Sequence, residues 1–162
     1  MTALCFMPDS AVLLSVGKDR CLSLWENKRV WGLRRTHAFI HEDWINSVAV
    51  SPNGRYAVTA SNDFKVKLWP TRDYRSAVDF TGHTGAVTCV GFVNDDLVYS
   101  SSFDGTCKLW LLDGSEVTTL HGHTQAVNAV ASFADVVVTG SDDGHIRSAQ
   151  PLIGHEIATF TG

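Results

Sequence analysis

A histidine, a hydroxyl residue and an aspartate recur together in this sequence, and these are the side-chain types of a Ser–His–Asp hydrolase triad. In such a triad the imidazole takes the proton of a hydroxyl that attacks a carbonyl carbon. One set is His83, Ser100 and Asp104. Two further sets repeat the same order: His41, Thr59 and Asp63, and His123, Thr139 and Asp143. An enzyme needs one exposed nucleophile, and this chain has no G-x-S-x-G elbow, so the recurrence predicts structure and not catalysis.

A tryptophan follows the same pattern. The aspartates lie 44, 41 and 39 residues apart, at Asp19, Asp63, Asp104 and Asp143. A tryptophan comes six residues after each of the first three, at Trp25, Trp69 and Trp110, and Ala149 stands there in the fourth repeat. Each marker histidine precedes its aspartate by 22, 21 or 20 residues. Two fixed points within a period of about 40 residues indicate a repeat architecture.

The segments between these markers predict short strands and no helices. One period contains four of them, at Ala86–Phe92, Leu97–Ser102, Thr106–Trp110 and Glu116–Leu120. Asp104-Gly105 lies between the second and third, where a tight hairpin turn is expected. Comparable first strands are predicted at Ile45–Val50 and Ala126–Phe133.

Four strands in each period, marked by Gly-His and Trp, are typical of WD repeats. The chain resembles the WD-repeat β-propeller family over essentially all of its 162 residues. The resemblance implies an all-β propeller of four four-stranded antiparallel blades, at about 1–40, 41–82, 83–122 and 123–162. The sequence departs from the family pattern after each tryptophan, where Glu26, Pro70 or Leu111 replaces the usual Asp.

The resemblance also implies a hydrogen-bonded structural tetrad of His, Ser/Thr, Asp and Trp in each blade. Complete tetrads are expected at His41, Thr59, Asp63 and Trp69, and at His83, Ser100, Asp104 and Trp110. Partial ones are expected at Ser15, Asp19 and Trp25, and at His123, Thr139 and Asp143. A buried carboxylate is costly unless donors surround it, and the other three side chains can supply them.

Most rings of this family have about seven blades, so four leave the ring unfinished unless they close by themselves. Repeat units cannot bury their apolar faces alone. Three alternatives follow: a partial ring or half-ring completed by another chain, an eight-bladed ring made from two copies, or a closed ring of four.

The family resemblance implies a protein-interaction scaffold that presents loop side chains on one face. The expected contact residues are Trp44, Asn46, Asn62, Thr88, Phe103, Asn128 and Asp142. Trp44 and Phe103 are large apolar side chains of the kind that dominate binding energy. The alternative for both is packing against a neighbouring loop.

Composition limits the other partners. The net charge of −4 provides no general attraction for nucleic acid. The histidines lack a cysteine or carboxylate cluster that would complete a zinc site, and no cofactor is expected. Four scattered cysteines and no secretory pattern predict free thiols in the cytoplasm, with the nucleus as an alternative.

One basic run, Lys28–Arg35, raises a membrane alternative. Its Leu33-Arg34-Arg35-Thr36 is close to the L/F-R-R-G motif of phosphoinositide-binding propellers, but Thr36 replaces the glycine. A lipid site using Arg34 and Arg35 is therefore the weaker alternative. The stronger one is a solvated outer strand whose charges discourage edge pairing.

Overall fold

The computed structural model describes residues 1–8, 10–150 and 155–161. Within these ranges the chain forms four four-stranded antiparallel sheets, named blades 1 to 4 in chain order. Blade 1 consists of β1 (Ala3–Phe6), β2 (Val12–Val16), β3 (Leu22–Asn27) and β4 (Trp31–His37). Blade 2 consists of β5 (Ile45–Val50), β6 (Tyr56–Ser61), β7 (Val66–Pro70) and β8 (Val78–Phe80). Blade 3 consists of β9 (Val87–Phe92), β10 (Leu97–Ser102), β11 (Cys107–Leu111) and β12 (Glu116–Leu120). Blade 4 consists of β13 (Val127–Phe133), β14 (Val136–Ser141), β15 (His145–Gln150) and β16 (His155–Thr161).

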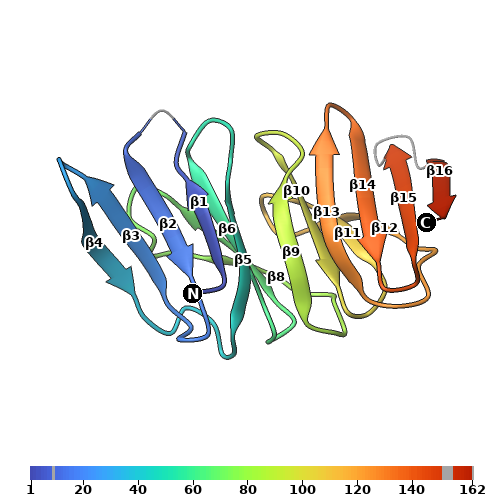
Figure 1. Ribbon diagram of the computed structural model, residues 1–162, viewed down its shortest axis with the longest axis horizontal. Helices are drawn as coiled ribbons and strands as arrows, with labels where there is room; N and C mark the ends of the chain where they lie inside the picture. The colour runs from blue at the N-terminus through green and yellow to red at the C-terminus, as the bar shows by residue number, and fades with distance from the viewer. Residues whose placement is uncertain (9, 151–154, 162) are drawn as a thin grey trace.

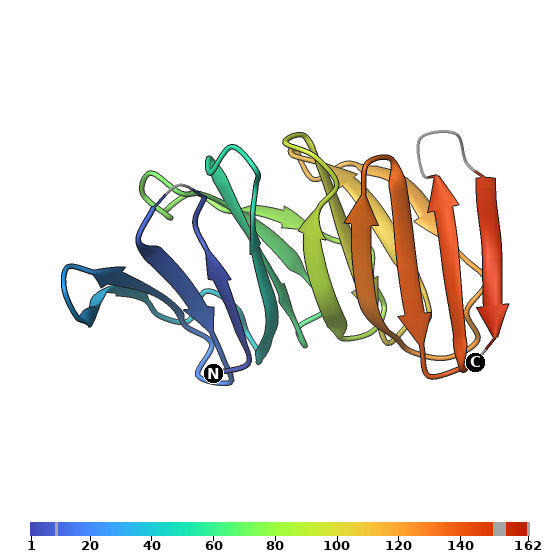
Figure 2. The same cartoon turned by 45° about the horizontal axis from the view of Figure 1, so that its top comes forward.

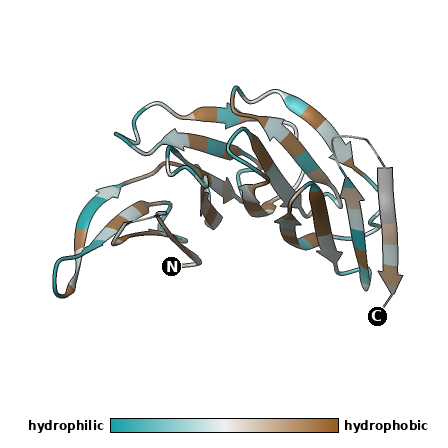
Figure 3. Ribbon diagram, turned by 90° about the horizontal axis from the view of Figure 1, so that it is seen from above, coloured by the Kyte–Doolittle hydropathy of each residue, from teal (hydrophilic) through white to brown (hydrophobic). Residues whose placement is uncertain are grey.

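The blades stand side by side in chain order (Figures 1 and 2). Seen from above they follow an open arc, with blade 1 at one end and blade 4 at the other (Figure 3). Both the all-β prediction and the partial ring are thereby confirmed, whereas closure of four blades into a ring is not what the chain does here. The range expected for blade 4, about 123–162, includes residues 151–154 and 162, which lie outside the described residues.

The strand predictions agree with the structure to within a residue at most ends. The second strand of blade 3 and the first strand of blade 2 have the predicted bounds. The third strand of blade 3 begins one residue later than predicted, at Cys107, because the turn that follows Asp104 takes up Thr106. The predicted hairpin turn is present, and Gly105 adopts a φ of 82° there.

In blades 1 to 3 burial increases from the outer strand toward the second strand. In β6 five of six residues are buried, because its sheet is covered by a neighbouring blade on both faces. In β4, at the outer rim, six of seven are exposed. Two apolar clusters fill the spaces between blades: one joins blades 1 and 2 through Leu14, Ile45 and Trp69, and the other joins blades 2 and 3 through Val58 and Trp110.

All four cysteines are free thiols, as expected, and Cys107 is the most deeply buried of them. Burial raises the pKa of the Cys107 thiol to about 12, so it stays uncharged at neutral pH. In the described part of the chain, no helix has the length and apolar character needed to cross a membrane.

Candidate partner-binding face

The side chains of the blade 3 set form a continuous hydrogen-bonded chain. The indole Nε1–H of Trp110 donates to Ser100 Oγ at 2.8 Å, and Ser100 Oγ lies 2.8 Å from His83 Nε2. His83 Nδ1 lies 2.8 Å from Asp104 Oδ2. Three structural elements meet in this arrangement: the loop before β9, strand β10 and strand β11, with Asp104 in the turn between the last two. The set therefore links the loop before β9 to the two central strands of the blade and the turn between them.

Blade 2 repeats this geometry. His41 lies 2.8 Å from Asp63 Oδ2 through Nδ1 and 2.8 Å from Thr59 Oγ1 through Nε2. Trp69 Nε1 donates to the same hydroxyl at 3.1 Å. Both sets are therefore tetrads with the same order of donors and acceptors.

The two end blades hold partial sets. In blade 1 Trp25 donates to Ser15 Oγ at 2.8 Å, and Asp19 accepts only from the backbone of its own turn. In blade 4 His123 lies 2.9 Å from both Asp143 Oδ2 and Thr139 Oγ1. Ala149 provides no indole there. Hydrogen bonds among the described residues therefore join every predicted tetrad residue to its set except Asp19, because in the other blades the aspartate is joined to the hydroxyl through a histidine.

Charge within the blade 3 tetrad follows from its surroundings. Burial by itself would raise the pKa of Asp104, but the hydrogen bonds from Thr106, His83 and the Thr84 amide outweigh it and lower the pKa to about 2. Burial lowers the pKa of His83 despite its hydrogen bond to Asp104. At neutral pH the imidazole is therefore neutral: Nδ1–H donates to the carboxylate, and Nε2 accepts the Ser100 hydroxyl proton.

In this tetrad the hydroxyl, imidazole and carboxylate are hydrogen bonded in the same sequence as in a hydrolase triad, but the hydroxyl is not accessible to a substrate. Ser100 and Thr59 are fully buried, and each hydroxyl also accepts a hydrogen bond from a tryptophan indole. A nucleophile must reach its substrate, so this geometry favours a structural role. Among the described residues, no group of three or more His, Cys, Asp or Glu is placed to hold a metal ion.

The predicted contact residues lie in the connection before β5, at the starts of β5, β9 and β13, and in the turns between the second and third strands of blades 2 to 4. These segments run along one edge of the arc, the lower edge in Figure 1. This edge carries the turns between the second and third strands and the connections between blades. Trp44 is 45% exposed, and Lys18 Nζ lies 4.1 Å from the centre of its ring. Phe103 is 59% exposed in the β10–β11 turn. Trp44 therefore packs partly against the blade 1 turn, whereas Phe103 faces solvent more fully.

Two other predicted contact residues hold neighbouring blades together. Asn46 Nδ2 donates to the Val87 carbonyl of blade 3 at 2.9 Å and to Asn62 Oδ1 at 2.7 Å. Thr88 Oγ1 donates to the Val127 carbonyl of blade 4 at 2.6 Å. Their polar atoms already have partners within the chain, so they contribute to the surface mainly by fixing its shape.

In blades 1 and 4 the position that corresponds to Asn46 and Thr88 is occupied by Thr2 and Asn128. Thr2 of blade 1 donates through its hydroxyl to the Ile45 carbonyl of blade 2. Asn128 of blade 4 is exposed and donates to Asp142 in its own blade. Within the described residues, Asn128 therefore bonds inside its own blade, whereas Asn46, Thr88 and Thr2 each bond to the next blade.

Sequence reasoning missed two further exposed aromatic residues on this face, Phe39 in the β4–β5 connection and Phe64. Phe64 follows Asp63 in the β6–β7 turn, is 47% exposed and has a φ of 69°. A bulky residue is rarely found in the left-handed region, where glycine is favoured. The signal was present in the alignment of repeats, because Gly105 and Gly144 occupy the same turn position in blades 3 and 4.

Arg34 and Arg35 lie on the exposed outer strand β4, where the charged outer-strand interpretation places them. Together with Arg72 and Tyr74 they line a pocket of about 200 Å³ between β4 and the segment after β7.

Comparisons with known proteins agree with this architecture. The family model described as "WD domain, G-beta repeat" matches residues 1–26, 33–70, 75–110 and 114–148. Over 170 aligned residues the chain is 31% identical to "Telomerase protein component 1" of Mus musculus and 30% identical to the protein of that name from Rattus norvegicus. Each alignment includes 97% of this chain but only 6% of the relative.

Two solved structures share the fold. The crystal structure of the RRP9 WD40 repeats superimposes with a TM-score of 0.92, and the structure of U3-55K with one of 0.90. Both are 25% identical in sequence, and in both the alignment covers 99% of this chain and 51% of the other chain. The four blades thus align with about half of each of those chains, and the chain belongs to the WD-repeat β-propeller family.

Proposed function

We propose that the chain is a non-enzymatic scaffold that binds a protein partner through the loop face that carries Trp44, Phe64 and Phe103. The observation that carries this proposal is that these three large aromatic side chains stand exposed at one edge of the arc, where Phe39 of the β4–β5 connection is exposed as well. Exposed aromatic groups of this kind provide much of the binding energy at protein interfaces. Each one buries a large apolar surface from water on binding and loses little side-chain conformational entropy.

The arrangement of the face supports rigid presentation. Hydrogen bonds from Asn46 and Thr88 fix each blade against the next directly beneath the aromatic loops. The tetrads fix the turns that carry Phe64 and Phe103, because Asp63 and Asp104 accept hydrogen bonds within those turns. A preformed surface loses little entropy on binding.

Family membership agrees with this function at a coarser level. WD40 propellers generally bind protein partners and are generally not enzymes. Two relatives are named as a telomerase component, and on that analogy we propose an intracellular chain, in the cytoplasm or nucleus, that works inside a larger assembly.

The experiment compares variants of the exposed aromatic residues. Trp44→Ala and Phe103→Ala should each reduce capture of the partner at least tenfold in affinity purification with quantitative mass spectrometry. Phe133→Ala is the matched control, because Phe133 is 86% exposed at the opposite edge of the arc. Equal loss with Phe133→Ala, or loss of the folded state with Trp44→Ala, would contradict the proposal.

A second candidate function is structural: the open ends of the arc assemble with further blades. The outward face of blade 4 exposes Val138, Ile146 and Phe160, and that of blade 1 exposes Leu4 and Phe6. Light scattering over a concentration series tests self-completion. A mass twice that of the chain supports two copies in one ring, and a concentration-independent monomer excludes that form.

A phosphoinositide site at Arg34 and Arg35 has one supporting observation, the small pocket that both line with Arg72. Co-sedimentation with vesicles that contain a phosphoinositide tests it. Binding that is lost in Arg34→Ala/Arg35→Ala would favour this site over the protein-binding face.

A further inference from the structure

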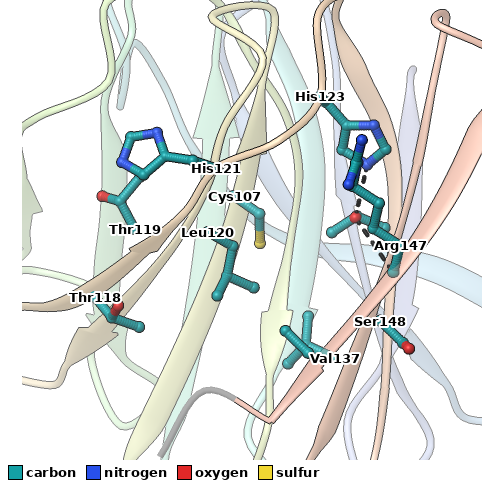
Figure 4. A pocket seen from close by; sticks show the side chains of 11 residues that line it. Cys107, Thr118, Thr119, Leu120, His121, His123, Val137, Arg147 and Ser148 are labelled. Carbon is teal, nitrogen blue, oxygen red and sulfur yellow. Dashed lines mark hydrogen bonds between the residues drawn. The ribbon is translucent and has the colours of Figure 1, made fainter. Parts of the chain in front are cut away.

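A pocket of about 260 Å³ lies between blades 3 and 4. Leu120 of β12 lines one side, and Val137, Thr139, Arg147 and Ala149 of blade 4 line the other. Figure 4 shows Leu120 and Val137 pointing into the same space, with His123 and Arg147 above them. Apolar side chains therefore face one another in the pocket, His123 and Arg147 lie at its upper end, and Thr118 and Ser148 add hydroxyl groups to its lower lining.

The strand register explains why the pocket exists. Ala149 pairs with Val137 across β15 and β14, as Trp110 pairs with Val98 in blade 3 and Trp69 with Ala57 in blade 2. In those two blades the same register position places an indole between adjacent sheets. The alanine side chain of blade 4 ends at Cβ, and the space remains as a pocket.

Blade 3 shows which interactions an indole makes at this position. There the Trp110 ring packs against Phe80 of the preceding blade, with ring centres 5.6 Å apart, and its N–H donates to Ser100 Oγ. Blade 4 retains the matching acceptor. Thr139 Oγ1 keeps its bonds to His123 Nε2 at 2.9 Å and to the Arg147 carbonyl at 3.4 Å. No indole N–H joins them, so the hydroxyl can accept one more hydrogen bond.

Arg147 occupies part of the indole position. In blade 3 a Cβ added to Gly82 would lie 3.2 Å from the Trp110 ring, and in blade 4 a Cβ added to Gly122 would lie 3.1 Å from the Arg147 guanidinium. The guanidinium thus covers the outer end of the pocket. Guanidinium groups stack on aromatic faces, so Arg147 favours an aromatic occupant over an aliphatic one.

We propose that this pocket binds a small planar aromatic molecule with a ring N–H, such as an indole, which donates to Thr139 Oγ1 and packs between Leu120 and Val137 beneath Arg147. The size is suitable, because apolar cavities of about 150 Å³ take up benzene and the pocket is larger. The proposal is independent of the partner-binding face, which lies at the loop edge.

The first experiment titrates the protein with indole and follows backbone amide signals by NMR. Shifts should concentrate at Leu120, Val137 and Thr139, and disappear in Ala149→Trp, whose own side chain fills the pocket. Should that variant fail to fold, Ala149→Leu provides a smaller filling with the same expected loss. No shifts, shifts elsewhere in the chain, or equal shifts in the filled variant would overturn the proposal.

A second measurement tests the hydrogen bond alone. Indene has the shape of indole without the N–H, so indole should bind about 3- to 10-fold more tightly, as expected for one neutral hydrogen bond. In Thr139→Val the two affinities should become equal. Equal affinities in the unaltered protein would remove Thr139 from the site and overturn the proposed recognition.

Discussion

Replacement of Asp104 by asparagine tests the tetrad most directly. The substitution preserves size and removes the charge. In the folded chain Asp104 accepts from His83 Nδ1 at 2.8 Å, from the Thr84 amide at 3.0 Å and from the Thr106 amide at 2.9 Å. An asparagine NH₂ would face at least one of these donors, so one hydrogen bond is lost and a donor is opposed by a donor.

The magnitude follows from the pKa of Asp104. An ordinary pKa of 3.8 against one of about 2 in the folded chain corresponds to about 2 kcal/mol, because each tenfold change in proton affinity is equivalent to about 1.4 kcal/mol. The Asp104 side chain is 10% exposed, so solvent screens part of this. We therefore expect Asp104→Asn to lower the free energy of unfolding by about 1–2 kcal/mol at pH 7.

The sign of the pH dependence is fixed by the same shift. The folded-state pKa of Asp104 lies below the unfolded one, so its stabilisation is complete above about pH 4 and is lost as the pH falls toward 2. Urea unfolding at pH 7 and at pH 2.5 measures it, and the difference between the two proteins should shrink at the lower pH. Asp96→Asn is the control, since Asp96 is exposed in a turn of the same blade. A loss as large at pH 2.5 as at pH 7 would refute the electrostatic reasoning.

Other substitutions separate the remaining roles. Asn46→Ala should lower the free energy of unfolding by about 1–2 kcal/mol, because the Val87 carbonyl loses its donor. Asn128→Ala should change the free energy of unfolding by less than about 0.5 kcal/mol. Equal effects of the two substitutions in urea unfolding would contradict the inter-blade role of Asn46. Phe64→Gly should raise the free energy of unfolding by about 1 kcal/mol, because glycine adopts the left-handed φ without strain, and should weaken partner binding. A loss of stability in calorimetry would argue that the Phe64 ring packs within the fold. Trp110→Phe should lower the Tm by several degrees, because Ser100 loses the indole donor; an unchanged Tm would show that the indole N–H contributes nothing.

The fold could be predicted from sequence because its signals are local and repeated. Each strand of blade 3 is bounded by a turn or a marker residue, and Asp104-Gly105 specifies the turn by itself. The tetrads could be located for a similar reason, since the separation of the marker histidine from its aspartate varies only from 20 to 22 residues among the repeats.

The contact residues could not be resolved in this way. Asn46 and Trp44 lie two residues apart, and both look like candidates for a partner. Only the neighbouring blade decides that Asn46 bonds to the Val87 carbonyl while Trp44 keeps much of its ring in solvent. The fate of such a side chain depends on an acceptor about 40 residues away, which no local pattern contains.

The sequence repeat is offset from the structural blade, and this offset explains why neighbouring blades are joined as they are. The matched repeat at 75–110 begins before β8, the outer strand of blade 2, and ends in β11, the third strand of blade 3. One repeat therefore joins two blades covalently, and Trp110 closes the same joint by packing its ring on Phe80 of β8. In the next joint Ala149 supplies no such ring, and a pocket with Arg147 over it lies at that position. Because nearest-neighbour contacts add along a repeat array, this joint should be the first to open when the chain is destabilised. Hydrogen exchange should accordingly be faster in β14 than in β10, even though both are second strands of their blades.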